Sequence, residues 1–108
     1  MLPDGFMDVP VNGAVVQKIT PVMGWAISEV GKEGVSIYVD RRYVMDAKTG
    51  LSRPDVKQVH PEVPGSENSG WEADLKLDRV PSGPHTITAL IRSKERSTMS
   101  LSSKVTVP

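Results

Sequence analysis

Residues 71–77, WEADLKL, alternate strictly between apolar and polar side chains. Successive side chains of a β-strand point to opposite faces, so this segment has one apolar face and one charged face. The apolar face requires a second layer of structure to cover it, whereas the charged face suits water. Residues 35–39, VSIYV, show the same period of two. We therefore expect the chain to fold as layered β-sheets.

Other segments rich in β-branched and apolar residues are separated by turn-forming residues. They predict strands at residues 14–19, 22–27, 35–39, 43–47, 71–77, 85–93 and 98–107, with a break at Thr20-Pro21. No segment shows the apolar period of an amphipathic helix. About seven short strands joined by turns are typical of an immunoglobulin-like sandwich. We predict an all-β, antiparallel β-sandwich that occupies residues 1–108 as one domain.

Trp25 and Ile27 share one face of segment 22–27, and Met23 joins them, so we expect that face to line the core. Trp71 begins the 71–77 strand on its apolar side and is also expected in the core. An exposed tryptophan could instead stack on a sugar ring. Gly24, in mid-strand, predicts a bulge or a close approach of another backbone.

Two segments lack a clear strand pattern. Residues 1–12 contain two prolines and are predicted to form a lead-in or an edge strand, with Phe6 as an anchor in the core. Residues 48–70 are predicted to form one long loop between the two blocks of strands, with a short extended or helical turn near residues 56–59. Loops longer than about 12–15 residues are uncommon and often functional. This loop is therefore the first candidate for a binding surface.

Arg53 and Asp55 flank Pro54 in this loop, so a residue of fixed φ separates two opposite charges. Together with Asn68 they are candidates for binding a sugar or a peptide. The alternative is that Arg53 and Asp55 form hydrogen bonds that hold the loop on the sandwich. The ordering of so long a loop favours this alternative.

Tyr38, Arg42 and Tyr43 surround the turn of a predicted β-hairpin between residues 35–39 and 43–47. Tyr38 has the opposite parity to the inward positions Ile37 and Val39, so it is expected to point outward. A sheet face with Tyr38, Arg42 and Tyr43 could bind a glycan or a neighbouring domain. Ordinary cross-strand packing on a solvated face is the alternative.

Catalytic and metal-binding signatures are weak. His60 and His85 are the two histidines, and neither has the spacing of a dense ligand set. Glu62, Glu67 and Asn68 supply oxygen atoms that could bind calcium in the loop. Serine, histidine and acidic residues all occur, but no Gly-x-Ser-x-Gly elbow is present. We expect no enzyme and no cofactor; a small hydrolase or a metal-dependent enzyme is the third alternative.

The 13 basic and 13 acidic residues give a formal net charge of zero. Nucleic-acid binders normally carry a basic excess, so we expect no nucleic-acid partner. Attachment to an anionic membrane is disfavoured for the same reason, and no apolar run reaches the length of a membrane span. Cysteine is absent, which excludes disulfides and thiolate metal sites.

Five short motifs occur in order along the chain. They are Gly24-Trp25-Ala26, Val35-x-Ile37-x-Val39-Asp40, Arg53-Pro54-Asp55-Val56, Asn68-Ser69-Gly70-Trp71 and Ser82-Gly83-Pro84-His85-Thr86-Ile87. In this order they resemble a bacterial Ig-like accessory domain, a module of large secreted, surface-associated or carbohydrate-related proteins. At the hairpin that family often has Asp-Gly, whereas this chain has Asp40-Arg41, which puts a type I′ turn in question.

The resemblance extends over nearly the whole chain. It implies a β-sandwich of the immunoglobulin or fibronectin type III kind and an extracellular or cell-surface location, but no activity and no ligand. We expect a non-catalytic accessory, spacer or interaction module of a larger bacterial protein, with neighbouring domains as partners. The alternative is a carbohydrate-binding module that uses the tyrosine face and the long loop to hold a polysaccharide.

Overall fold

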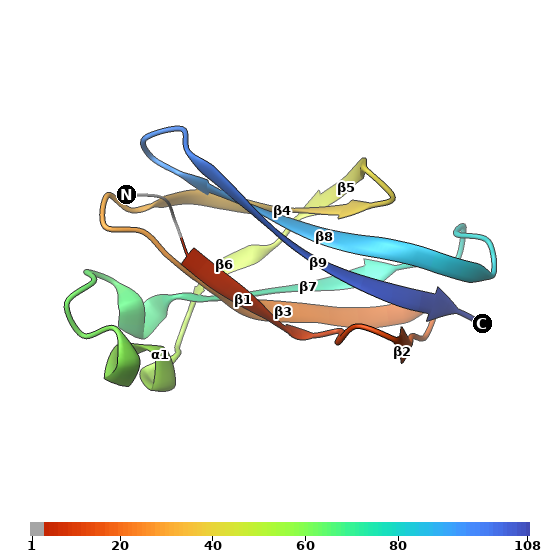
Figure 1. The fold of residues 1–108 in the computed structure, drawn as a ribbon, viewed down its shortest axis with the longest axis horizontal. Coiled ribbons are helices and arrows are strands. Elements are labelled where there is room, and N and C mark those ends of the chain that lie inside the picture. Colours follow the sequence, from red (N-terminus) through yellow and green to blue (C-terminus); the bar gives the residue numbers. More distant parts are fainter. Residues whose placement is uncertain (1–3) are drawn as a thin grey trace.

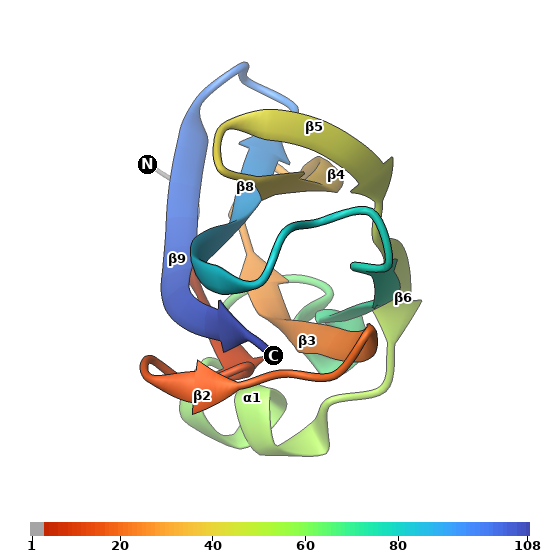
Figure 2. The same ribbon diagram turned by 90° about the vertical axis from the view of Figure 1, so that its right-hand side faces the viewer.

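Nine strands form two β-sheets in the computed structural model, which describes residues 4–108 apart from the side chains of residues 32 and 33. Sheet A contains, in spatial order, β1 (Asp4–Val9), β3 (Ile19–Ile27), β7 (Gly70–Lys76) and β6 (Lys48–Leu51). Sheet B contains β2 (Ala14–Val15), β9 (Thr98–Val107), β8 (Gly83–Ser93), β4 (Lys32–Val39) and β5 (Arg42–Asp46). Figures 1 and 2 show the two layers packed face to face.

The strand order matches an immunoglobulin sandwich. Sheet A has the order of the A, B, E and D strands, and β9, β8 and β4 have the order of the G, F and C strands. Neighbouring strands are antiparallel except for β2, which pairs in parallel with β9. The predicted all-β, immunoglobulin-like sandwich is therefore confirmed.

The main core lies between the sheets and follows the alternation of the strands. Trp71 and Leu75 of β7 are 1% and 0% exposed, and Ile37 of β4 is 0% exposed. Side chains from both sheets form one continuous buried cluster. Burying a large aliphatic side chain contributes about 2 kcal/mol, so this cluster provides most of the driving force for folding.

The prediction for the face of β3 was wrong. Val22 and Ala26 point into the main core, whereas Trp25 and Ile27 point to the outer side of sheet A. Both faces of this strand are apolar, so alternation alone does not show which face is inward. Phe6 pairs with Trp25 across β1 and β3, and it is 57% exposed instead of anchored in the core.

The strand break predicted at Thr20-Pro21 does not occur. β3 continues through Pro21, which pairs with Asp74 of β7. The pairing of β1 with β3 extends only as far as Met23, so one edge of β3 is unpaired at Pro21. Because no strand pairs with that edge, the N–H that proline lacks removes no ladder hydrogen bond. The predicted strand at residues 14–19 is reduced to Ala14–Val15.

Residues 48–70 contain regular structure. They form the edge strand β6, helix α1 (Pro54–Val59) and the 3₁₀ turn η1 (Ser66–Asn68). Proline at the first helical position and Asp55 in the first turn favour the start of α1, and Pro61 disfavours its continuation beyond His60. Figure 2 shows α1 on the side of sheet A that faces away from sheet B. There Val56 and Val63 cover Ile27 and Trp25 in a second buried cluster.

Gly24 shows the predicted close approach. A Cβ atom on this residue would lie 2.0 Å from the Phe6 carbonyl oxygen and 2.8 Å from the Trp71 ring. Only glycine therefore lets β1 and the Trp71 side chain reach β3 together.

Candidate functional site

The six residues selected from the sequence lie in three separate places. Tyr38 and Tyr43 share the outer face of sheet B, and Arg42 lies beside them on the opposite side of the hairpin. Arg53 and Asp55 lie at the start of α1. Asn68 lies at the end of η1. They do not converge on one site.

Arg53 links three segments. Its Nε and Nη2 donate to the two carboxylate oxygens of Asp55 at 2.9 and 2.8 Å, and its Nη1 donates to Asp8 of β1 at 2.7 Å. The Arg53 backbone N–H also donates to the Glu67 carbonyl oxygen at 2.8 Å. These bonds fasten α1 to β1 and η1, and they occupy the guanidinium that was a candidate for binding a sugar.

The same contacts shift the pKa values of Arg53 and Asp55. Hydrogen bonds to Asp55, and then to Asp8, raise the pKa of Arg53 above its usual range. The hydrogen bonds from Arg53 lower the pKa of Asp55 from 3.8 to about 2. Bidentate pairing with a carboxylate is the geometry for which the planar guanidinium is best suited.

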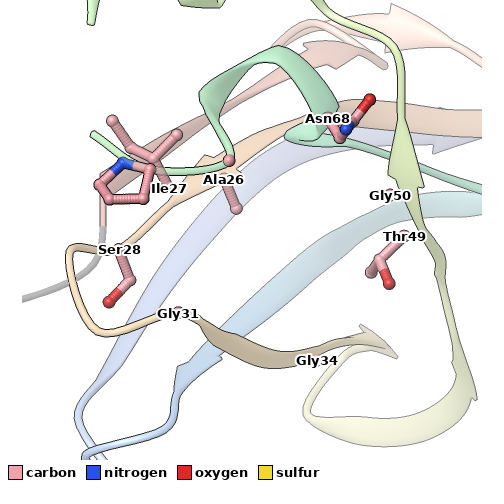
Figure 3. A pocket seen from close by; sticks show the side chains of 10 residues that line it. Ala26, Ile27, Ser28, Gly31, Gly34, Thr49, Gly50 and Asn68 are labelled. Atoms are coloured by element: carbon pink, nitrogen blue, oxygen red, sulfur yellow. The ribbon is translucent and has the colours of Figure 1, made fainter. Parts of the chain in front are cut away.

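Asn68 is exposed and borders a cavity of about 260 Å³ at one end of the sandwich. Figure 3 shows the residues around it, which come from the end of β3, the β3–β4 turn, the start of β4, β6, the segment before η1 and η1 itself. The lining includes Gly31, Gly34, Gly50 and Gly65, and none of the described side chains that line it is charged. The described side chains of this lining therefore supply no charge to a ligand.

A row of four side chains crosses the outer face of sheet B, one from each of β5, β4, β8 and β9. The register pairs Tyr43 with Tyr38, Tyr38 with Thr88, and Thr88 with Ser102. The tyrosine rings meet edge to face with centroids 5.8 Å apart. The Thr88 and Ser102 hydroxyls share a hydrogen bond of 2.9 Å. Aromatic rings and hydroxyl groups thus lie side by side on an open surface.

Arg41, which was not selected from the sequence, lies next to this row. It borders two adjoining hollows of about 320 and 430 Å³, and Thr88 also lines both. Arg42 pairs with the inward residue Val39, so its side chain leaves the strand on the side away from Tyr38. The arginine on the tyrosine face is therefore Arg41.

The turn that carries Arg41 is held by Asp40 and His85. Asp40 accepts hydrogen bonds from His85 Nδ1 and from the Thr86 backbone N–H, the latter at 2.9 Å. His85 Nε2 lies 2.7 Å from the Pro81 carbonyl oxygen. The bond to His85 lowers the pKa of Asp40, and the bonds to Asp40 and Pro81 raise the pKa of His85. Both ring nitrogens face acceptors, an arrangement that favours the imidazolium form of His85.

Serine, histidine and an acid meet around one small cavity of about 140 Å³, which Ser28, His60 and Glu62 help to line. His60 Nδ1 lies 3.8 Å from the Glu62 carboxylate, which exceeds a hydrogen bond, and Ser28 Oγ has no hydrogen-bond partner. The His60 ring instead faces Trp25, with centroids 5.6 Å apart. The described residues contain no assembled catalytic triad and no group of three histidine or acidic side chains arranged to hold a metal ion.

Comparisons with solved structures find the same fold in longer proteins. An endo-β-1,4-mannanase from Thermotoga petrophila matches with a TM-score of 0.71 and 15% identity, over 100% of this chain and 20% of that chain. Fibronectin(III)-like modules of Clostridium thermocellum CbhA match with a TM-score of 0.67 and 14% identity, over 98% of this chain and 46% of that chain. This chain is an immunoglobulin- or fibronectin type III-like β-sandwich. It spans about a fifth of the mannanase chain and about half of the CbhA chain.

A third match is CopC from Methylosinus trichosporium OB3b, with a TM-score of 0.50 and 13% identity, over 96% of this chain and 93% of that chain. No protein-family model and no curated protein sequence matches the chain. In residues 4–108 no helix has the length and apolar character needed to cross a membrane.

Proposed function

We propose that this chain is a non-catalytic accessory module that connects other domains of a larger, extracellular bacterial protein. The observation that carries this proposal is that the first strand begins at one end of the sandwich and the last strand finishes at the other end. β1 begins beside the end of β3, where Asp4 pairs with Ile27, and β9 ends beside the start of β8, where Val107 pairs with Gly83.

These two ends are separated along the long axis. β4 begins just after β3 ends, and Lys32 pairs with Ser93 at the end of β8. The start of β1 and the end of β8 therefore lie at one end of the sandwich, and the end of β9 lies at the other (Figure 1). With principal extents of 43 × 26 × 19 Å, a chain that enters at one end and leaves at the other separates its neighbours along 43 Å.

The comparisons support a modular role. The mannanase and the CbhA protein contain a region of this fold within longer chains. The Arg53 contacts and the buried cluster under α1 also support it, because a long segment fastened to the sandwich resists extension better than a loose one.

The test joins two and three copies of the chain head to tail and measures their shape by small-angle X-ray scattering. A connecting module is expected to lengthen the particle by about the 43 Å long axis with each added copy. The melting temperature is expected to stay equal to that of one copy, since each copy folds alone. A three-copy protein that collapses to a compact particle would contradict the proposal.

A second candidate function is carbohydrate binding at the outer face of sheet B. The edge-to-face pair of the half-buried Tyr38 and the exposed Tyr43 favours it, since aromatic rings beside hydroxyl groups suit the mixed apolar and polar surface of a sugar. Arg53 and Asp55, which the sequence also suggested for this role, are bonded to each other and to Asp8.

A further inference from the structure

We propose that the two adjoining hollows on the outer face of sheet B bind a carboxylate-bearing polysaccharide, such as a polymer of uronic acid, with Arg41 as the residue that selects the carboxylate. This inference rests on the carbohydrate-binding candidate and names the class of sugar. It goes beyond the connecting role, which does not require any ligand.

The two hollows adjoin, and together they are called the depression. Tyr38, Leu90 and Ser100 line one part, Asp40, Thr86 and Ser102 line the other, and Arg41 and Thr88 line both. The depression crosses β4, β8 and β9 and is open to solvent along its length. Such a shallow, open shape accommodates a stretch of an extended chain better than it encloses a small molecule.

Arg41 supplies an available positive charge at the centre of this depression. Among the described side chains, no carboxylate lies within ion-pair distance of Arg41, in contrast to Arg53, which is paired twice. The neighbouring Asp40 carboxylate is already bonded to His85 and the Thr86 N–H. A planar guanidinium without a partner fits a ligand carboxylate with two parallel hydrogen bonds.

Other basic side chains on this face also favour an anionic ligand. Arg92 donates to Ser36 Oγ, and Lys104 pairs with Thr86 across β9 and β8. The acidic residue Asp46 lies beside Tyr43 on β5, and it accepts from Ser36 Oγ at 3.1 Å. The surface around the depression therefore favours an anionic ligand over a neutral or cationic one.

Arg41 has a backbone conformation that is unfavourable for a residue with a side chain. Asp40 has φ 49° and Arg41 has φ 71°, which is the left-handed pair of a type I′ turn. The sequence had put this turn in question because it lacks glycine. A side chain in this region costs about 1 kcal/mol relative to glycine, and such strained residues concentrate at functional sites. Here the bonds from Asp40 to β8 hold the strained turn in place.

A sugar fits better than an acidic peptide. The hydroxyl groups of Thr86, Thr88, Ser100 and Ser102 can each donate and accept, as sugar hydroxyls do. A peptide bound along the sheet would need unpaired backbone groups, but β8 is hydrogen-bonded to β4 on one side and β9 on the other. Along β8 the depression therefore offers side-chain hydroxyls and an aromatic ring, but no main-chain edge.

The test measures binding by isothermal titration calorimetry with three probes: oligogalacturonate, the neutral oligosaccharide mannohexaose and oligoglutamate. The whole chain is used as the wild type and as the variants Arg41→Ala, Arg41→Gly and Arg42→Ala. Arg42→Ala is the matched control, since it removes the same charge from the adjacent residue on the other side of the hairpin. Arg41→Gly removes the side chain from a turn that glycine fits well, so this variant is expected to fold.

We expect oligogalacturonate to bind in preference to both other probes. Loss of a charged hydrogen-bond donor is expected to weaken its binding about tenfold or more in both Arg41 variants, and Arg42→Ala is expected to bind within about twofold of wild type. Equal binding of oligoglutamate, or an equal loss in Arg42→Ala, would overturn the inference. Binding of mannohexaose alone would overturn it but leave the carbohydrate-binding candidate standing, and binding of no saccharide would remove both and leave the connecting role.

Discussion

Asp40 and His85 fix the tip of the β4–β5 hairpin to the start of β8. One carboxylate oxygen of Asp40 bonds the His85 ring, and the other accepts from the Thr86 backbone N–H. The second ring nitrogen of His85 bonds the Pro81 carbonyl oxygen, which ties in the loop after β7. His85 and Asp40 therefore connect the tip of the β4–β5 hairpin, the start of β8 and the loop between β7 and β8, beside the tyrosine face.

This arrangement makes the stability depend on pH. The folded pKa of His85 is raised above 6.5, so its contribution is complete below that value and is lost as the pH rises through the folded pKa. The folded pKa of Asp40 is lowered below 3.8, so its contribution is present above 3.8 and is lost as the pH falls through the folded pKa. The contribution of the pair to stability is therefore greatest between these two limits.

Urea unfolding of wild type and His85→Gln across this range measures the effect. The difference in free energy of unfolding between the two proteins is expected to be largest near pH 5 and to shrink toward pH 9. A difference that is constant with pH would show that His85 does not bind as an imidazolium.

Replacement of Arg41 by glycine is expected to stabilise the chain. Glycine adopts the left-handed conformation of the turn without the penalty of a side chain, so the free energy of unfolding should rise by about 1 kcal/mol. Arg42→Gly is the control, and in strand β5 it should destabilise instead. Chemical denaturation measures both variants, and a loss of stability in Arg41→Gly would contradict the assigned turn.

Arg53→Ala is expected to loosen α1 and to lower the melting temperature by about 5 °C, since two partly exposed ion pairs are lost. Amide hydrogen exchange should accelerate in α1 and η1 but not in the main core. Arg79→Ala, at an exposed position just after β7, is the control and should leave the melting temperature unchanged. Unchanged exchange in α1 of Arg53→Ala would show that the segment does not depend on this contact.

Gly24→Ala is expected to detach β1 from β3. The added methyl group overlaps the Phe6 carbonyl and the Trp71 ring, so the free energy of unfolding should fall by about 2 kcal/mol or more. Met23→Ala changes the neighbouring, outward-facing residue of β3 and should have a smaller effect. Thermal unfolding and exchange of the Phe6 amide report both changes, and equal effects of the two substitutions would argue against the close approach.

The two tryptophans show how far alternation predicts this fold. Trp71 lies in a strand with one apolar and one charged face, and the period of two placed it correctly in the core. Trp25 lies in a strand that is apolar on both faces, and the second face is covered by α1 from residues 48–70. The local pattern identifies such a strand but does not show which of its faces points into the main core, because that depends on tertiary contact with the segment that carries α1.

The candidate site was only partly predictable. The outward parity of Tyr38 follows from the sequence, and so does that of Thr88 and Ser102, since each alternates with apolar residues of β8 or β9. The place of Arg41 depends on the turn type, which the residues Asp40-Arg41 do not favour and which contacts with His85 and Thr86 impose. Because tertiary contacts set the turn type, they also determine that Arg41, and not Arg42, reaches the tyrosine face.

The proposal that the outer face of sheet B is the contact surface of this module is tested most directly by the amide NMR spectrum of ¹⁵N-labelled protein during titration with oligogalacturonate. Chemical-shift changes are expected to concentrate at Tyr38, Arg41, Thr88 and Ser102. Changes confined to residues 48–70 would contradict the proposal and assign the contact surface to the segment that carries α1 and η1.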